Sequence, residues 1–138
     1  MRVAEDVQDF EIEGDFSLSK HGGWFWLAGW TGREGYLIYD AGLSSTTWFL
    51  YRISANPPAC TQIHFYSRKF ITGQQRVAIS VRNGHLNFRV GDFRFLEHFH
   101  LPEYERGDVI TGTCLPPSLY KTRDVTIHAL RLRHQDGN

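Results

Sequence analysis

The dipeptide Asn83-Gly84 constrains the fold of this chain more than any other feature of the sequence. It separates two runs, 76–82 and 85–90, in which apolar and polar residues alternate. A two-residue type I′ turn needs positive φ at both central positions, and asparagine followed by glycine accepts that geometry best. The segment therefore predicts a β-hairpin with its tip at this dipeptide, and Gly91-Asp92 predicts a second tight turn shortly after it.

Short runs rich in aromatic and β-branched residues fill the rest of the chain, and no stretch has the periodicity of an amphipathic helix. The expected strands are 10–18, 24–31, 36–40, 48–54, 61–66, 76–82, 85–90, 93–99, 109–113 and 125–133. Many short strands with turn residues between them are typical of a sandwich or a barrel. The predicted fold class is therefore all-β, as a two-sheet antiparallel sandwich.

Length and charge limit the organisation and the partners of the chain. Its 138 residues, 41% of them hydrophobic, predict one domain, 1–138, either complete or excised from a larger protein. Lys and Arg number 15, and so do Asp and Glu, so no net charge attracts a polyanion and no nucleic-acid partner is expected. No apolar run approaches the roughly 18 residues of a membrane span, so membrane insertion is not expected either.

The N-terminus lacks the basic region and apolar run of a signal peptide, which leaves the compartment open, including a secreted or surface-attached parent protein. The two cysteines, Cys60 and Cys114, have neither CxxC spacing nor a histidine at zinc-finger distance, so a structural zinc site is not expected. They are either free thiols or partners in one disulfide. No cofactor is predicted.

Residues 24–30, WFWLAGW, are apolar at every position, which predicts a strand in the middle of a sheet. Residues 48–53 alternate with aromatic side chains on both faces in the same way. Aromatic rings in a groove are typical of carbohydrate sites, because the apolar face of a sugar stacks on a ring while polar neighbours bind its hydroxyls. Such rings are also typical of a core between two sheets, and the pattern leaves both interpretations open.

Five segments together carry a recognisable pattern. They are 10–18 (FEIEGDFSL), 24–30 with 35–39, 77–90 (VAISVRNGHLNFRV), 107–113 (GDVITGT) and 125–133 (VTIHALRLR). They resemble a concanavalin A-like lectin/glucanase domain of the laminin-G-like type, and the resemblance covers most of the chain. It implies a jelly-roll sandwich of two curved sheets, in which the concave face or the rim loops bind ligand, usually a glycan, in the members that bind one. No calcium motif of the family is present, so the resemblance does not extend to a metal-dependent lectin site.

The preferred function is a noncatalytic binding module with a glycan as partner, and a structural or accessory domain with a protein partner is the alternative. The candidate groove residues are Trp24, Trp26, Trp30, Tyr36, Trp48 and Arg52. Three further candidates, expected to donate hydrogen bonds from the polar face of the hairpin, are Arg82, His85 and Arg89. The planar guanidinium of arginine suits sugar hydroxyls or the carboxylate of a uronic acid.

An enzyme is the third interpretation, and a run of carboxylates is its first possible basis. Glu11, Glu13 and Asp15 alternate on one strand face, where neighbouring carboxyls can approach the roughly 5 Å separation of a retaining glycosidase pair. Their order, E-x-E-x-D, differs from the E-x-D-x-E of glucanases in the superfamily, and the run lies in the first expected strand rather than a central one. We therefore expect a solvated acidic face.

A second possible basis is the set His98, His100 and Glu105, whose spacing approximates the first metal motif of cupins. Two imidazoles and a carboxylate suit several divalent metals. The cupin segment that supplies a further histidine should follow, but Pro116-Pro117 has no glycine and no histidine near it. We therefore expect surface histidines and no metal site.

Overall fold

The computed structural model describes residues 1–18, 24–40, 47–67, 71–113 and 125–134. The strands are β1 (Arg2–Val7), β2 (Phe10–Leu18), β3 (Trp24–Trp30), β4 (Glu34–Asp40), β5 (Thr47–Ala55), β6 (Pro58–Ser67), β7 (Gly73–Arg82), β8 (His85–Val90), β9 (Phe93–His100), β10 (Gly107–Thr113) and β11 (Val125–His134). In these described ranges no helix is long and apolar enough to cross a membrane.

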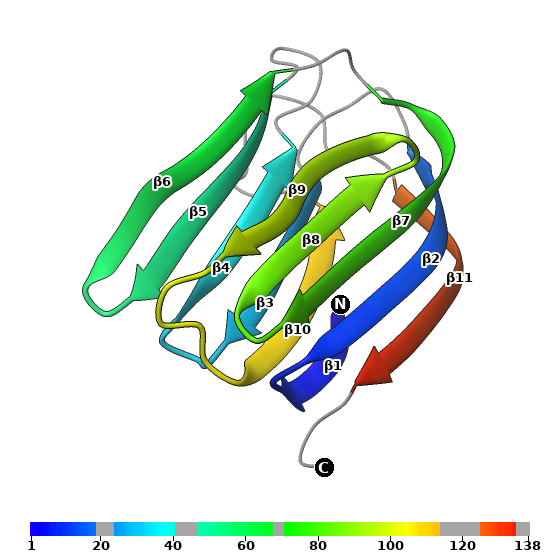
Figure 1. Cartoon of the computed structure of the whole chain (residues 1–138). Helices are drawn as coiled ribbons and strands as arrows, with labels where there is room; N and C mark the ends of the chain where they lie inside the picture. The colour runs from blue at the N-terminus through cyan, green and yellow to red at the C-terminus, as the bar shows by residue number, and fades with distance from the viewer. Residues whose placement is uncertain (19–23, 41–46, 68–70, 114–124, 135–138) are drawn as a thin grey trace.

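The strands form two sheets packed face to face (Figure 1). One sheet has six strands in the order β1-β10-β3-β4-β5-β6, and the other has five in the order β11-β2-β7-β8-β9. Neighbouring strands are antiparallel in both sheets. The predicted fold class, an all-β antiparallel sandwich of jelly-roll type, is confirmed.

The predicted hairpin is present. Asn83 and Gly84 have φ angles of 51° and 73°, both in the left-handed region that a type I′ turn requires. The flanking residues Arg82 and His85 face each other across the ladder. Val90 likewise pairs with the first residue of β9, so the second predicted turn is confirmed.

The sequence pattern does not predict β1. Its outer positions carry charge, and only Ala4 and Val7 among its residues are buried. The strand pairs with β10 through an interrupted register at the edge of the six-stranded sheet. Charged side chains are common on edge strands because they discourage pairing with another chain. Cys60 is a free, exposed cysteine on β6, and Cys114 lies outside the described residues.

The core between the sheets is dominated by aromatic rings. The five-stranded sheet contributes alternate residues of β2 and of the hairpin, including Phe16 and Phe88. The six-stranded sheet contributes Trp24, Trp26 and Trp48. The ring centroids of Trp24 and Phe16 lie 5.6 Å apart, and those of Trp48 and Phe88 lie 5.7 Å apart. Contacts of this kind across the interface bury enough apolar surface to hold the two sheets together.

Candidate ligand-binding face

The inner face of the six-stranded sheet holds three of the four tryptophans expected to line a groove. Trp24 and Trp26 are each 1% exposed, and Trp48 is 3% exposed. Their rings pack against one another and against the phenylalanines of the five-stranded sheet. The expectation that these three line an open groove is therefore wrong, because the second sheet covers them. Trp30, the last residue of β3, is half-buried.

The buried indoles differ in how their polar atom is satisfied. Nε1 of Trp24 donates a hydrogen bond to Oγ1 of Thr111, at 3.3 Å, and that hydroxyl donates in turn to the carbonyl of Phe25, at 2.9 Å. Among the described residues, Nε1 of Trp26 has no hydrogen-bond partner. A buried N–H without a hydrogen bond costs free energy. Trp24 avoids this cost and is therefore held by polar as well as apolar contacts.

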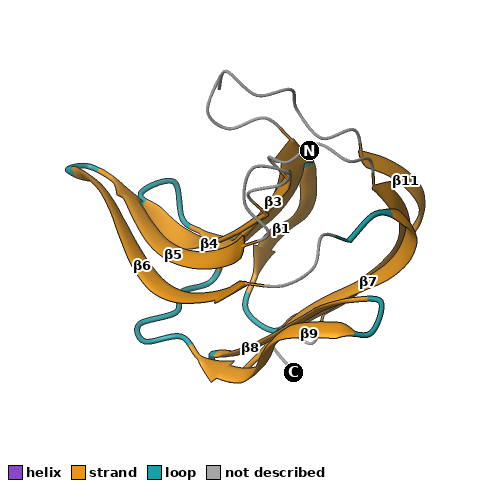
Figure 2. Cartoon of the chain, turned by 90° about the horizontal axis from the view of Figure 1, so that it is seen from above, coloured by secondary structure: helices purple, strands orange, loops and turns teal. Residues whose placement is uncertain are grey.

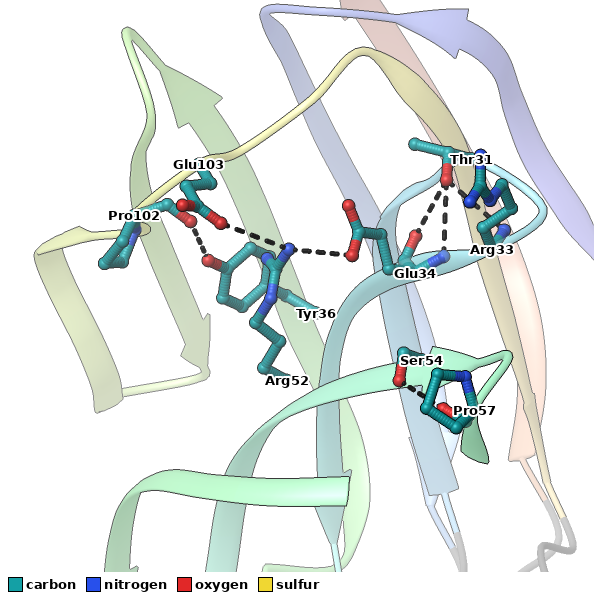
Figure 3. A network of polar contacts seen from close by, with 9 residues as sticks. All are labelled: Thr31, Arg33, Glu34, Tyr36, Arg52, Ser54, Pro57, Pro102 and Glu103. Carbon is teal, nitrogen blue, oxygen red and sulfur yellow. Dashed lines mark hydrogen bonds and ion pairs between the residues drawn. The ribbon is translucent and has the colours of Figure 1, made fainter. Parts of the chain in front are cut away.

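Tyr36 and Arg52 were both expected at the groove, and the structure brings them together at one end of the sandwich (Figure 3). The guanidinium carbon of Arg52 lies 5.0 Å from the centre of the Tyr36 ring. The same guanidinium forms ion pairs with Glu34, at 3.1 Å, and with Glu103, at 3.9 Å. The Tyr36 hydroxyl donates to the carbonyl of Pro102. Both side chains are therefore engaged within the protein rather than free to bind a ligand.

This network connects the six-stranded sheet to the segment that follows β9. Burial raises the pKa of the Tyr36 phenol, and the neighbouring Arg52 opposes that rise. The arginine also connects β5 to the segment that follows β9, since Glu103 lies there. An arginine stacked on a ring and flanked by carboxylates is held in one geometry. The network therefore ties the end of the six-stranded sheet to the loop across it.

The outer face of the six-stranded sheet carries a second set of aromatic rings. Alternation along each strand places them opposite the core residues. They are Phe25, Tyr39, Phe49, Tyr51 and Phe65, which we call the outer aromatic face. Four of the five pair directly in register across β3, β4, β5 and β6, in the order Phe25, Tyr39, Phe49, Phe65. Three steps between neighbouring strands make this row about 14 Å long.

Tyr51 extends the row along β5. Its ring stacks on that of Phe49, with centroids 5.4 Å apart and an interplanar angle of 18°. Burial raises the pKa of Tyr51, with smaller contributions from Cys60 and Tyr39. Phe65, on the edge strand, is 55% exposed. The outer aromatic face is thus ordered by ring stacking and still open to solvent at its β6 end.

The shape of the sheet favours ligand access to this face. Figure 2 shows the six-stranded sheet curved, with the face turned away from the five-stranded sheet on the hollow side of the curve. Polar groups on β5 and β6 border the row on both of its sides: the hydroxyls of Thr47 and Ser67 lie 3.1 Å apart on one side, and Gln62, which pairs with Tyr51, lies on the other. The arrangement offers apolar surface with hydrogen-bonding groups at its margin.

The three hairpin candidates lie on the other sheet. Arg82 forms an ion pair with Glu11 at 3.5 Å. Nδ1 of His85 lies 3.0 Å from the carbonyl of Asn83. Arg89 is half-buried on β8. These side chains project from the outer face of the five-stranded sheet, so the expectation that they join the tryptophans in one site is wrong.

The carboxylates of β2 are matched by arginines. Arg76 lies 3.3 Å from both Glu13 and Asp15, and Arg82 approaches Glu11. All three carboxylates are half-buried on the outer face of the five-stranded sheet. The expected solvated acidic face is instead a mixed, half-buried charged face, whose carboxylates pair with arginines.

The cupin-like arrangement is not formed. The backbone N–H of His98 donates to Oδ1 of Asn87 at an irregularity in β9, and His98 has a φ of 50°. The ring of His100 lies 5.2 Å from that of His85. Glu105 is exposed beyond the end of the strand. Across the described part of the chain, no group of three or more His, Cys, Asp or Glu side chains is placed to hold a metal ion.

The sequence interpretation missed the outer aromatic face although it identified the right strands. A usable signal was present in residue size: on β3 the tryptophans occupy one face, and phenylalanine, leucine and glycine occupy the other. Because tryptophan buries the most apolar area, the face that carries it is the better choice for the core.

No protein-family model matches the chain, and no curated protein matches its sequence. Two solved structures share its fold. The carbohydrate-binding module CBM66 from Bacillus subtilis superimposes with a TM-score of 0.66 at 12% identity, covering 94% of this chain and 77% of that one. Sheep galectin-11, solved in complex with glycerol, gives a TM-score of 0.63 at 9% identity, covering 96% and 95%. At these identities the likeness concerns the jelly-roll fold alone.

Proposed function

We propose that the chain is a noncatalytic carbohydrate-binding module whose ligand stacks on the outer aromatic face. The observation that carries this proposal is the register of Phe25, Tyr39, Phe49 and Phe65 across four adjacent strands. Successive rings are one strand spacing apart, about 4.8 Å, which is close to the width of a sugar ring. A row with this spacing can contact consecutive units of an oligosaccharide.

The chemistry of the face fits a sugar better than a wholly apolar ligand. The C–H face of a pyranose packs on aromatic rings, while its hydroxyls need hydrogen-bonding partners. Tyr39 and Tyr51 carry hydroxyls within the aromatic face, and Gln62 and Ser67 lie at its margin. Stacking would supply the affinity and these polar groups the orientation.

The fold likeness supports the same proposal. One structural neighbour is a carbohydrate-binding module by name, and the other is a galectin solved with glycerol, a small polyol. Both are far from this chain in sequence, so the support comes from the architecture. A curved sheet with an open outer face is the feature relevant to binding here (Figure 2).

Two adjacent aromatic residues on β6 provide a matched test. Phe65 and Tyr66 are 55% and 50% exposed but point to opposite faces, since Phe65 pairs with Phe49, and Tyr66 packs 5.5 Å from Phe93 of the other sheet. A glycan array should first identify a ligand for the native chain. Calorimetry with that glycan should then show that Phe65→Ala weakens binding by about 1–3 kcal/mol, while Tyr66→Ala changes it little.

The proposal fails if the array yields no glycan ligand. It also fails if both alanine variants retain full affinity, or if Tyr66→Ala alone reduces it at equal folded fraction.

A second candidate function is docking of a protein partner along β6. This edge strand has ten residues, Pro58–Ser67, none of them charged, whereas β1, β9 and β11 all carry charged side chains. An uncharged edge can pair with a strand of another chain. With a second copy of the chain as the partner, the native protein should associate with increasing concentration in analytical ultracentrifugation, and Gln62→Lys should abolish that association, an effect that glycan binding alone does not predict.

A further inference from the structure

The outer face of the five-stranded sheet contains a trough of about 390 Å³ that the proposed function does not use. Its floor is β7, where Ala78 and Ser80 present small side chains. Longer side chains from the flanking strands form its walls, because Glu13 pairs across Ala78 with Arg89, and Glu11 pairs across Ser80 with Asn87. The trough exists because small residues on the central strand lie between long ones.

The wall from β2 consists of hydrogen-bond acceptors. Glu11 and Glu13 both line the trough, and each is paired with an arginine, Arg82 at 3.5 Å and Arg76 at 3.3 Å. These ion pairs offset most of the carboxylate charge. The carboxylate oxygens still have lone pairs that can accept from hydroxyl groups, since a carboxylate accepts several hydrogen bonds.

The opposite wall carries the donors Arg89 and Asn87 on β8, and beside them Arg94 and Glu97 of β9, which form an ion pair with each other at 2.9 Å. Arg89 has no hydrogen bond, ion pair or ring contact with the residues that the structure describes. Only one other arginine in these ranges is equally half-buried, and that one, Arg52, is held by two glutamates and a tyrosine ring. Arg89 is half-buried as a residue, and with no partner among the described residues its guanidinium donors remain available to a ligand.

Asn87 adds a second donor beside Arg89. Its Oδ1 accepts a hydrogen bond from the backbone N–H of His98 at 2.9 Å. This bond orients the side-chain amide and leaves its NH2 group to donate to a ligand. The Ser80 hydroxyl on the floor can donate or accept. The trough therefore combines an anion-binding wall with a wall that suits hydroxyl groups.

We propose that this trough binds a uronic acid unit of an acidic glycan. The sugar carboxylate lies against Arg89, whose planar guanidinium can bind both of its oxygens, and Asn87 donates a further hydrogen bond. The sugar hydroxyls donate to the carboxylates of Glu11 and Glu13. The site lies on the opposite sheet from the outer aromatic face and does not depend on it.

Calorimetric titration of the full chain with trigalacturonate, and with its methyl ester as an uncharged counterpart, tests this site. We expect the acid to bind and the ester to bind at least about tenfold more weakly. Arg89→Gln should abolish the preference for the acid, and Arg89→Lys should restore part of it, because lysine keeps the charge without the planar geometry. Arg33→Gln serves as the matched control and should have no effect, because Arg33 is an exposed arginine in the turn between β3 and β4, away from the trough.

Three results would overturn the proposal: no binding of trigalacturonate, equal binding of acid and ester, or an equal loss in the Arg33 and Arg89 variants. Tyr51→Ala separates this site from the outer aromatic face. If it abolishes trigalacturonate binding while Arg89→Gln does not, the acid binds on the aromatic face, and the trough is not its site.

Discussion

The two faces of the six-stranded sheet make an instructive pair, because both are aromatic and only one is core. Trp24, Trp26 and Trp48 on the inner face are at most 3% exposed. Phe49 and Tyr51 on the outer face, from the same strand as Trp48, are half-buried and stack on each other. The five-stranded sheet covers the face that carries the larger rings, and the smaller rings of the other face remain partly exposed.

Neighbouring residues on β5 provide the strongest test of that difference. Trp48→Ala should reduce the free energy of unfolding by about 3–5 kcal/mol, because it opens a cavity among Phe88, Phe93 and Phe95. Phe49→Ala, one residue away on the outer face, should cost clearly less. Chemical denaturation of both variants measures this difference, and equal losses would show that the outer face is packed like a core.

A smaller effect is expected from the polar anchor of the inner face. Thr111→Val removes the acceptor for Nε1 of Trp24 and should cost about 1–3 kcal/mol, since a buried donor loses its partner. Trp26 is the contrasting case, because its Nε1 has no hydrogen-bond partner among the described residues. Denaturation midpoints of Thr111→Val and Thr111→Ser separate the loss of the hydroxyl from the loss of the methyl group. The serine variant keeps a hydroxyl and should retain more stability, and a valine variant as stable as the native chain would disprove the anchor.

Arg52 was expected to bind ligand, and the structure gives it a structural role instead. Arg52→Met should lower stability by about 1 kcal/mol or less, because the lost ion pairs with Glu34 and Glu103 are only partly buried. Glycan affinity should not change. If Arg52→Met kept native stability and weakened glycan binding, Arg52 would belong to the ligand site.

The smallest predicted effect concerns two tyrosines on opposite faces. Burial raises the pKa of both Tyr36 and Tyr51 above the ordinary value of 10.0. As pH rises past that value, the unfolded chain loses these protons first, so the free energy of unfolding falls until the folded phenols also ionise. A glycan on the outer face should raise the pKa of Tyr51 further and leave that of Tyr36 unchanged. Ultraviolet titration of the Tyr36→Phe and Tyr51→Phe variants, with and without ligand, assigns the shift, and a ligand-dependent shift of Tyr36 would contradict the account.

The local pattern of the sequence was sufficient for the strands and the sandwich. Asn83-Gly84 determines its hairpin through φ angles that few other residue pairs accept, and such short-range rules are visible without a structure. Strand β1 was missed because its residues, RVAEDV, lack the apolar alternation of the other strands, and only its pairing with the distant β10 makes it a strand. The expected groove falls on the covered face because alternation on β3 and β5 defines two faces without showing which one the second sheet covers. The tryptophans on one face of β3 were the signal that favoured that face as core.

Backbone amide chemical shifts, measured during titration with a glycan identified on the array, show directly whether the outer aromatic face binds it. We expect the perturbed amides to cluster on the strands that carry the outer aromatic face, β3 to β6. Those around the buried Phe16 and Phe88 of the five-stranded sheet should move little. Perturbations confined to the rim loops, or to the five-stranded sheet for a neutral glycan, would contradict the claim that the outer aromatic face is the binding surface.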